Sequence, residues 1–102
     1  MKVWQVGVSD CESSSIICVC STKEIALREM FKKRDSLVAD WKEVEAQVEK
    51  ERREWCEKEG REYFEDDMYK QMISNLSSND WENWNNYPHE RPWIYETEVI
   101  AV

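Results

Sequence analysis

The sequence has little of the residues that end or bend regular structure, with two glycines and two prolines in 102 residues. Glycine-rich phosphate loops and the G-x-S-x-G turn of serine hydrolases are absent, and two glycines leave no room for them. Only one histidine, His89, is present. A histidine that acts as a general base needs a partner to orient it, and its neighbour Glu90 is badly placed for that because adjacent side chains rarely meet. The sequence therefore predicts a protein that is not an enzyme.

Long apolar segments are also missing. No run approaches the roughly 20 apolar residues that span a bilayer, and the start, MKVWQVGVSD, lacks the apolar region of a signal peptide. We therefore expect a cytoplasmic protein with no membrane partner. Four cysteines in a cytoplasmic chain do not predict disulfides, and Cys18 and Cys20 are best read as small core residues. A zinc site is typically built on a C-x-x-C turn, which this chain lacks, so we expect no metal and no cofactor.

The net charge of the chain indicates which classes of partner it can bind. The formal net charge is −8, whereas a protein held by phosphate contacts carries a basic stripe. We therefore expect no direct nucleic-acid partner. The charge is uneven, because residues 22–36 hold five Lys or Arg against three acids, and residues 40–67 hold twelve acids against six bases. The middle of the chain is predicted to be a negatively charged rod.

Two β segments are predicted at the start of the chain. In residues 2–8 (KVWQVGV), Trp4, Val6 and Val8 lie on one strand face, and residues 16–20 (IICVC) follow the polar break SDCESSS. Alternation and β-branched residues are typical of strands. The two segments are predicted to pair as a hairpin.

A long helix is predicted over residues 22–59. Ser21 as N-cap with Glu24 three residues later forms a capping box, and Gly60 suits the C-terminal end. Arg34 interrupts an apolar stripe along this helix. The stripe consists of Ala26, Met30, Leu37, Trp41, Val44, Val48 and Trp55.

The helix is too long for its sheet. Unbroken, it would extend about 57 Å, whereas a seven-residue strand spans about 23 Å. It must therefore overhang the sheet or break, and Asp40 with Glu43 offers a capping pair at a break. A second amphipathic helix is predicted within residues 61–76, folded back on the first as a hairpin. Unless that helix covers the overhang, its apolar stripe predicts a homodimer.

Residues 93–102 (WIYETEVIAV) alternate as a final strand, with Trp93 and Tyr95 expected in the core. These elements predict an α+β fold, in which a small antiparallel sheet of three strands is covered by the long helix and the second helix. We expect residues 1–102 to form a single domain, with residues 37–91 as an acidic helical and aromatic-loop insert.

The segment SSNDWENWNNYPHERPWIYE, residues 77–96, contains a cluster of aromatic residues that has two possible roles. Trp81, Trp84 and Tyr87 are spaced by three residues, which places them on one face of a helical turn. They either cover the helical hairpin as a buried lid or form an interface hot spot, for which Trp and Tyr are favoured types. We predict these three as the contact surface if the segment has one. The predicted binding set is completed by acidic residues of the insert, namely Glu51, Glu54, Asp66 and Asp67.

Three features together resemble a known class of protein. These are the start KVWQV, the hairpin that leads into STKEIA, and the Trp/Tyr-rich terminal strand that carries TEV. The chain resembles the small ββαβ proteins of unknown function that are common in phage and prophage genomes, over residues 1–30 and 92–102. The acidic insert is longer than such proteins carry. The resemblance implies localisation in the host cell cytoplasm and a host protein as partner.

Three functions remain open from the sequence. We predict an acidic binding protein that inhibits or adapts a host protein, for example as an anti-defence factor. One alternative is a DNA mimic that blocks a nucleic-acid-binding enzyme, although the interspersed bases dilute the acidic field. The other is a sponge for a nucleotide signal, for which the basic cluster is limited to Arg28, Lys32 and Lys33.

Overall fold

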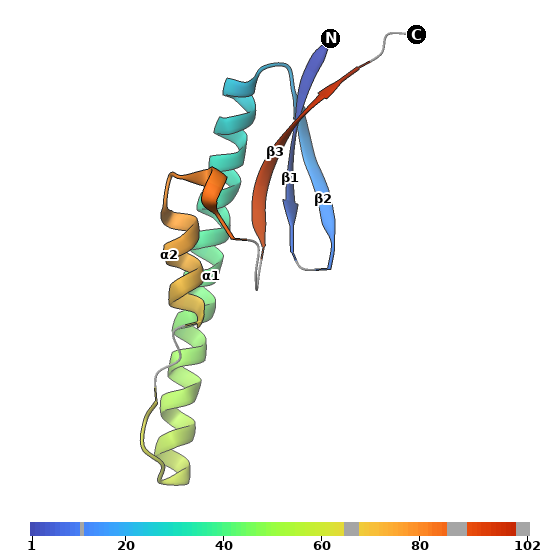
Figure 1. The fold of residues 1–102 in the computed structure, drawn as a ribbon. Coiled ribbons are helices and arrows are strands. Elements are labelled where there is room, and N and C mark those ends of the chain that lie inside the picture. The colour runs from blue at the N-terminus through green and yellow to red at the C-terminus, as the bar shows by residue number, and fades with distance from the viewer. Residues whose placement is uncertain (11, 65–67, 86–89, 100–102) are drawn as a thin grey trace.

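The computed structural model describes residues 1–10, 12–64, 68–85 and 90–99 (Figure 1). The elements follow in the order β1 (Lys2–Ser9), β2 (Ser14–Cys20), α1 (Lys23–Glu59), α2 (Met68–Ser77), the short 3-10 helix η1 (Trp81–Asn83) and β3 (Arg91–Glu98). The strands form one sheet in the order β2-β1-β3, and β1 pairs antiparallel with both neighbours. The predicted α+β fold is confirmed. Within the described residues, no helix has the length and apolar character to cross a membrane.

β1 and β2 form the predicted hairpin, with longer strands than the sequence pattern indicated. Asp10 closes the turn, because its Oδ1 accepts hydrogen bonds from the backbone N–H groups of Glu12 (2.8 Å) and Ser13 (2.7 Å). The pairing register shifts between Val6 and Gly7, which marks a β-bulge.

The face of β3 that packs against the core is the opposite of the face predicted from the sequence. Ile94 lies opposite Val6 and packs against the core, whereas Tyr95 is 61% exposed. Trp93 pairs with Gly7, and a Cβ added to Gly7 would collide with the indole. The expectation that Trp93 and Tyr95 are core residues was wrong, because a strand's side chains alternate and the face with Ile94 is the one that α1 covers.

α1 is one unbroken helix of 37 residues. Thr22, rather than the predicted Ser21, is the N-cap, and its Oγ1 accepts a hydrogen bond from the N–H of Ile25 at 3.2 Å. Gly60 ends the helix in the left-handed conformation, as predicted. The helix contains no Gly or Pro, so nothing in its backbone enforces the break considered at Asp40. It therefore overhangs the sheet (Figure 1).

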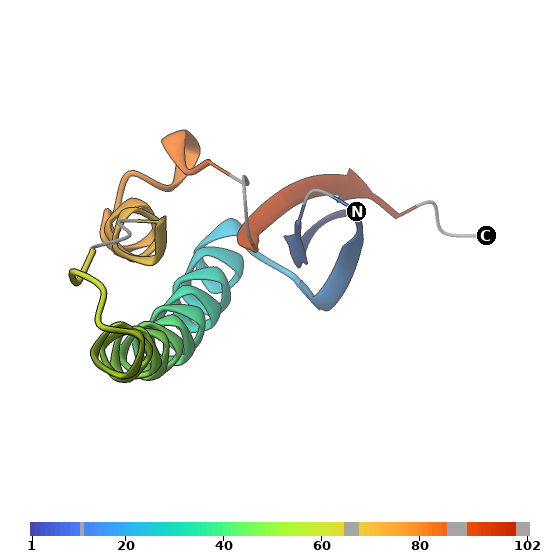
Figure 2. The ribbon, with the colours of Figure 1, turned by 90° about the horizontal axis from the view of Figure 1, so that it is seen from below.

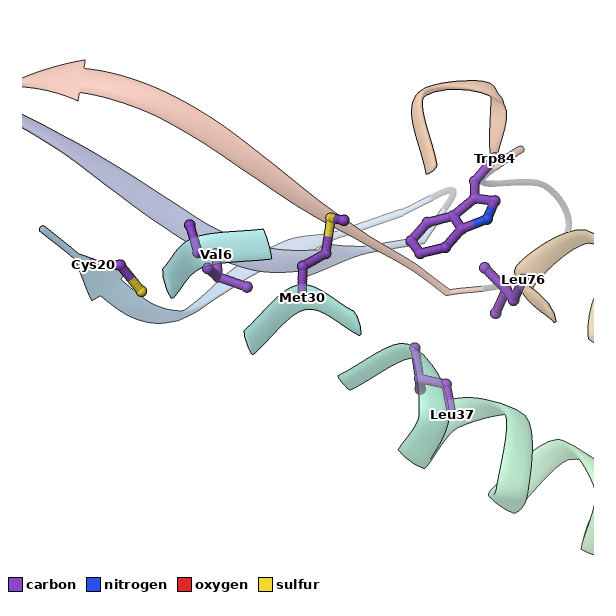
Figure 3. Close-up of a cluster of buried hydrophobic side chains, with 7 residues drawn as sticks. Val6, Cys20, Met30, Leu37, Leu76 and Trp84 are labelled. Atoms are coloured by element: carbon purple, nitrogen blue, oxygen red, sulfur yellow. The ribbon is translucent and has the colours of Figure 1, made fainter. Parts of the chain in front are cut away.

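The hydrophobic core has two connected parts (Figure 3). Val6 of β1 packs against Ala26 and Met30 of α1, and these three side chains are fully buried. Further along α1, Leu37 meets Leu76 of α2 and Trp84, which follows η1. The first residues of the predicted α1 stripe therefore pack against the sheet, and those further along pack against α2 and Trp84.

Arg34 joins α1 to the end of α2. Its Nη1 donates hydrogen bonds to the backbone oxygens of Leu76 (2.8 Å) and Ser78 (3.1 Å), and its Nη2 donates to Oδ1 of Asn79 (3.1 Å). Carbonyl groups at a helix C-terminus lack partners within the helix. Arg34 interrupts the apolar stripe because it supplies those partners.

The overhang, defined here as residues 40–59 of α1, is covered on one side by the chain that returns from Gly60. Tyr63 donates its hydroxyl hydrogen to Oε1 of Glu49 (3.1 Å), and the guanidinium of Arg53 lies 4.3 Å from the Tyr63 ring centre. Figure 2 shows α2 and the sheet on different sides of α1. On the stripe that continues the sheet-facing side, Val44 and Trp55 remain 38% and 45% exposed.

Candidate interaction surface

Of the three predicted aromatic residues, the two that the structure describes, Trp81 and Trp84, pack within the fold. Trp84 is only 4% exposed, meets Phe31 edge to face at 5.8 Å, and donates its indole N–H to the backbone oxygen of Ser78 at 2.8 Å. Trp81 is half-buried and packs against the core. Tyr87 lies outside the described residues. For Trp84, the lid interpretation fits the burial better than the hot-spot interpretation.

The predicted acidic residues lie elsewhere. Glu51 and Glu54 are exposed on the overhang, and Glu51 accepts a hydrogen bond from Nε2 of Gln47 at 2.9 Å. They are about 20 positions beyond Phe31, the residue that contacts Trp84, which corresponds to roughly 30 Å along the helix. Asp66 and Asp67 lie outside the described residues. Among the described members of the predicted set, the structure does not bring the acidic and the aromatic residues together.

A different surface is left uncovered on the sheet. Strand alternation and the pairing register place the odd-numbered residues of β1 and β3 on the face turned away from α1. The outer sheet face is defined here as the part of it formed by Gln5, Ile16, Val19, Trp93 and Tyr95. Val3 lies on the same side but is only 9% exposed. Ile16 and Val19 are more than half exposed, like Tyr95. Within the described residues, neither helix lies on this side of the sheet (Figure 2).

The outer sheet face is hollowed beside β3. A depression of about 420 Å³ is lined by Gln5, Arg91, Trp93, Ile94 and Tyr95. Arg91 reaches the backbone oxygen of Trp81 through Nη2 at 3.5 Å, while its buried Nε finds no acceptor among the described residues. The depression therefore combines two aromatic rings with an amide and a guanidinium.

A second depression, of about 240 Å³, lies at the hairpin end of the sheet. Lys33, Asp10 and Glu90 line it together with smaller side chains. The two backbone N–H groups that bind Asp10 hold the pKa of its carboxyl group below the ordinary value. Two carboxylates oppose the binding of a phosphate group, so this depression does not suit a nucleotide.

The cysteines show no arrangement for catalysis or metal binding in the part of the chain that the structure describes. Cys18 and Cys20 lie on the core face of β2 with their sulfur atoms 3.9 Å apart. Burial and the neighbouring Cys20 thiol raise the pKa of Cys18, which disfavours the nucleophilic thiolate. Among the described residues, no group of three or more His, Cys, Asp or Glu side chains could hold a metal ion.

Gln5, Ile16, Val19 and Arg91 were not predicted from the sequence as surface residues. One signal was available, because Gly7 in a strand marks a place where another group approaches closely. That group is Trp93, which fixes Tyr95 on the same outer face.

Comparison with protein-family models, with curated proteins and with solved structures finds no match to this chain.

Proposed function

We propose that this protein acts by binding another protein through the outer sheet face. The observation that carries the proposal is the exposure of Ile16, Val19 and Tyr95 on a sheet face that neither helix covers, with Gln5 between Val19 and Tyr95. Exposed apolar patches on small proteins mark interaction sites. The depression beside them adds Arg91, and Tyr and Arg are both frequent among interface hot spots.

The partner we propose is a host protein that this chain inhibits or adapts, in the manner of a small phage-encoded factor. The resemblance of the sequence to phage and prophage ββαβ proteins supports this choice, as does the acidic charge of −8. An acidic protein associates faster with a basic surface, because opposite charges steer the encounter. We therefore expect the partner surface to be basic around an apolar centre.

The proposal is tested by capture of a partner from a bacterial lysate, followed by reconstitution of the purified complex. Tyr95→Ala should weaken that complex by about 2 kcal/mol or more, equivalent to about thirtyfold in Kd. Phe64→Ala is the matched control, because Phe64 is an exposed aromatic residue at the far end of the molecule. Equal affinity of wild type and Tyr95→Ala for the partner would remove the outer sheet face from the site.

A functional assay completes the test. The captured protein should lose or change its activity when the wild-type chain binds at one to one, and Tyr95→Ala should restore it. Turnover of a nucleotide, peptide or nucleic acid by the purified chain alone, at an ordinary enzyme rate, would contradict the proposal.

A further inference from the structure

The overhang carries the repeat of a coiled coil. Positions 37, 41, 44, 48 and 55 alternate in steps of four and three, with Glu51 completing the series, which is the spacing of a and d positions in a heptad. Leu37 is buried, and Trp41 is partly buried, with its ring centre 5.6 Å from that of Tyr69 in α2. Below the end of the sheet, Val44 is 38% exposed. Trp55 is 45% exposed although the guanidinium of Arg61, in the return segment (residues 61–64), lies 5.2 Å from its ring centre.

We infer that the exposed stripe of the overhang packs against the same stripe of a second copy, with the two helices antiparallel about a two-fold axis. An axis midway between Val48 and Glu51 places Val44 of one copy in the same layer as Trp55 of the other. Such isologous pairing closes a dimer and leaves no open end. The inference does not depend on the function proposed above, because it uses a different surface.

Charge specifies the antiparallel arrangement. In this register, Glu45 of each copy faces Arg52 of the other, since antiparallel helices bring equivalent flanking positions together. Both side chains are half-buried at the edge of the stripe. Each copy carries a net charge of −8, so two copies repel one another overall. The pairing therefore needs the two local attractions between Glu45 and Arg52.

The oligomeric state tests the inference, measured by sedimentation equilibrium or light scattering over a concentration series in reducing buffer. Wild type should reach twice the chain mass. Glu45→Arg and Arg52→Glu should each weaken dimerisation by about tenfold or more, because each creates two like-charge contacts. The double variant Glu45→Arg/Arg52→Glu should return to within about threefold of wild type.

Two matched controls carry the same charge changes on the opposite side of the helix. Glu43→Arg and Lys50→Glu lie off the stripe and should leave dimerisation near the wild-type value. The Arg52 guanidinium also lies 5.3 Å from the Phe64 ring centre, so Arg52→Glu can change the stability of the monomer. If it changes the melting profile, Glu45→Arg is the variant that decides the test. A strict monomer at every concentration would overturn the inference. So would a dimer that the double variant does not restore, or one that the controls weaken equally.

Discussion

Arg34 and Trp84 bind the same backbone oxygen. Nη1 of Arg34 donates to the Ser78 oxygen at 3.1 Å, and Nε1 of Trp84 donates to it at 2.8 Å. The guanidinium also lies 5.7 Å from the Trp84 ring centre. One residue from α1 and one from beyond η1 therefore hold the end of α2 from both sides.

Arg34→Met should reduce the free energy of unfolding by about 2 to 3 kcal/mol, because the oxygens of Leu76 and Ser78 would lose charged donors. Arg34→Lys should recover only part of this loss, since an ammonium group cannot reproduce the guanidinium fork. Chemical denaturation measures both values. Arg28→Met, at an exposed position of the same helix, is the control. Equal stability of Arg34→Met and Arg28→Met would show that the Arg34 contacts contribute nothing.

Trp84→Ala should cost about 3 to 5 kcal/mol of unfolding free energy, the range for a buried Trp. Tyr95→Ala should cost less than about 1 kcal/mol, because that ring is already largely in solvent. Thermal or chemical unfolding of both variants compares one buried and one exposed aromatic residue. A small loss for Trp84→Ala would restore the hot-spot interpretation of Trp84.

Sequence reasoning identified the elements of this fold more securely than the direction of their faces. The helical stripe through Ala26, Met30 and Leu37 was predicted because a 3.6-residue period leaves one face apolar, and the structure buries these residues. β3 was predicted with its faces exchanged. In that strand both faces carry large apolar residues, so alternation alone could not decide between Trp93 and Ile94; the pairing with β1 decides it.

The candidate surface was harder to predict than the fold. Aromatic residues attract attention as binding residues, yet Trp84 is buried by contacts from α1 that lie about 50 positions away in sequence. The outer sheet face joins residues from three strands at opposite ends of the chain. The strand order makes these residues neighbours, and no local pattern in the sequence indicates that order.

Gly7→Ala should destabilise the sheet by about 1 to 3 kcal/mol, because the added methyl group would overlap the Trp93 indole and approach the Ser15 oxygen to 2.6 Å. Trp93→Ala in the same chain should relieve only the first clash. The double variant is therefore expected to lose less than the sum of the two single losses. Gln5→Ala, on the same strand face, is the control for the loss of a side chain. Strict additivity of Gly7→Ala and Trp93→Ala would contradict the close contact.

Acid should weaken the contact between the overhang and the return segment. The hydrogen bonds from Arg53 and then Tyr63 hold the pKa of Glu49 below its ordinary value. A carboxyl group with a lowered folded-state pKa stabilises the fold above its unfolded-state pKa, and this contribution is lost as the pH falls through the lower folded-state pKa. Tyr63→Phe removes one donor, so the folded-state pKa of Glu49 should rise in an NMR titration. Tyr95→Phe, which removes a hydroxyl from the sheet, should leave it unchanged. An unaltered Glu49 titration in Tyr63→Phe would show that the hydroxyl does not hold the carboxylate in solution.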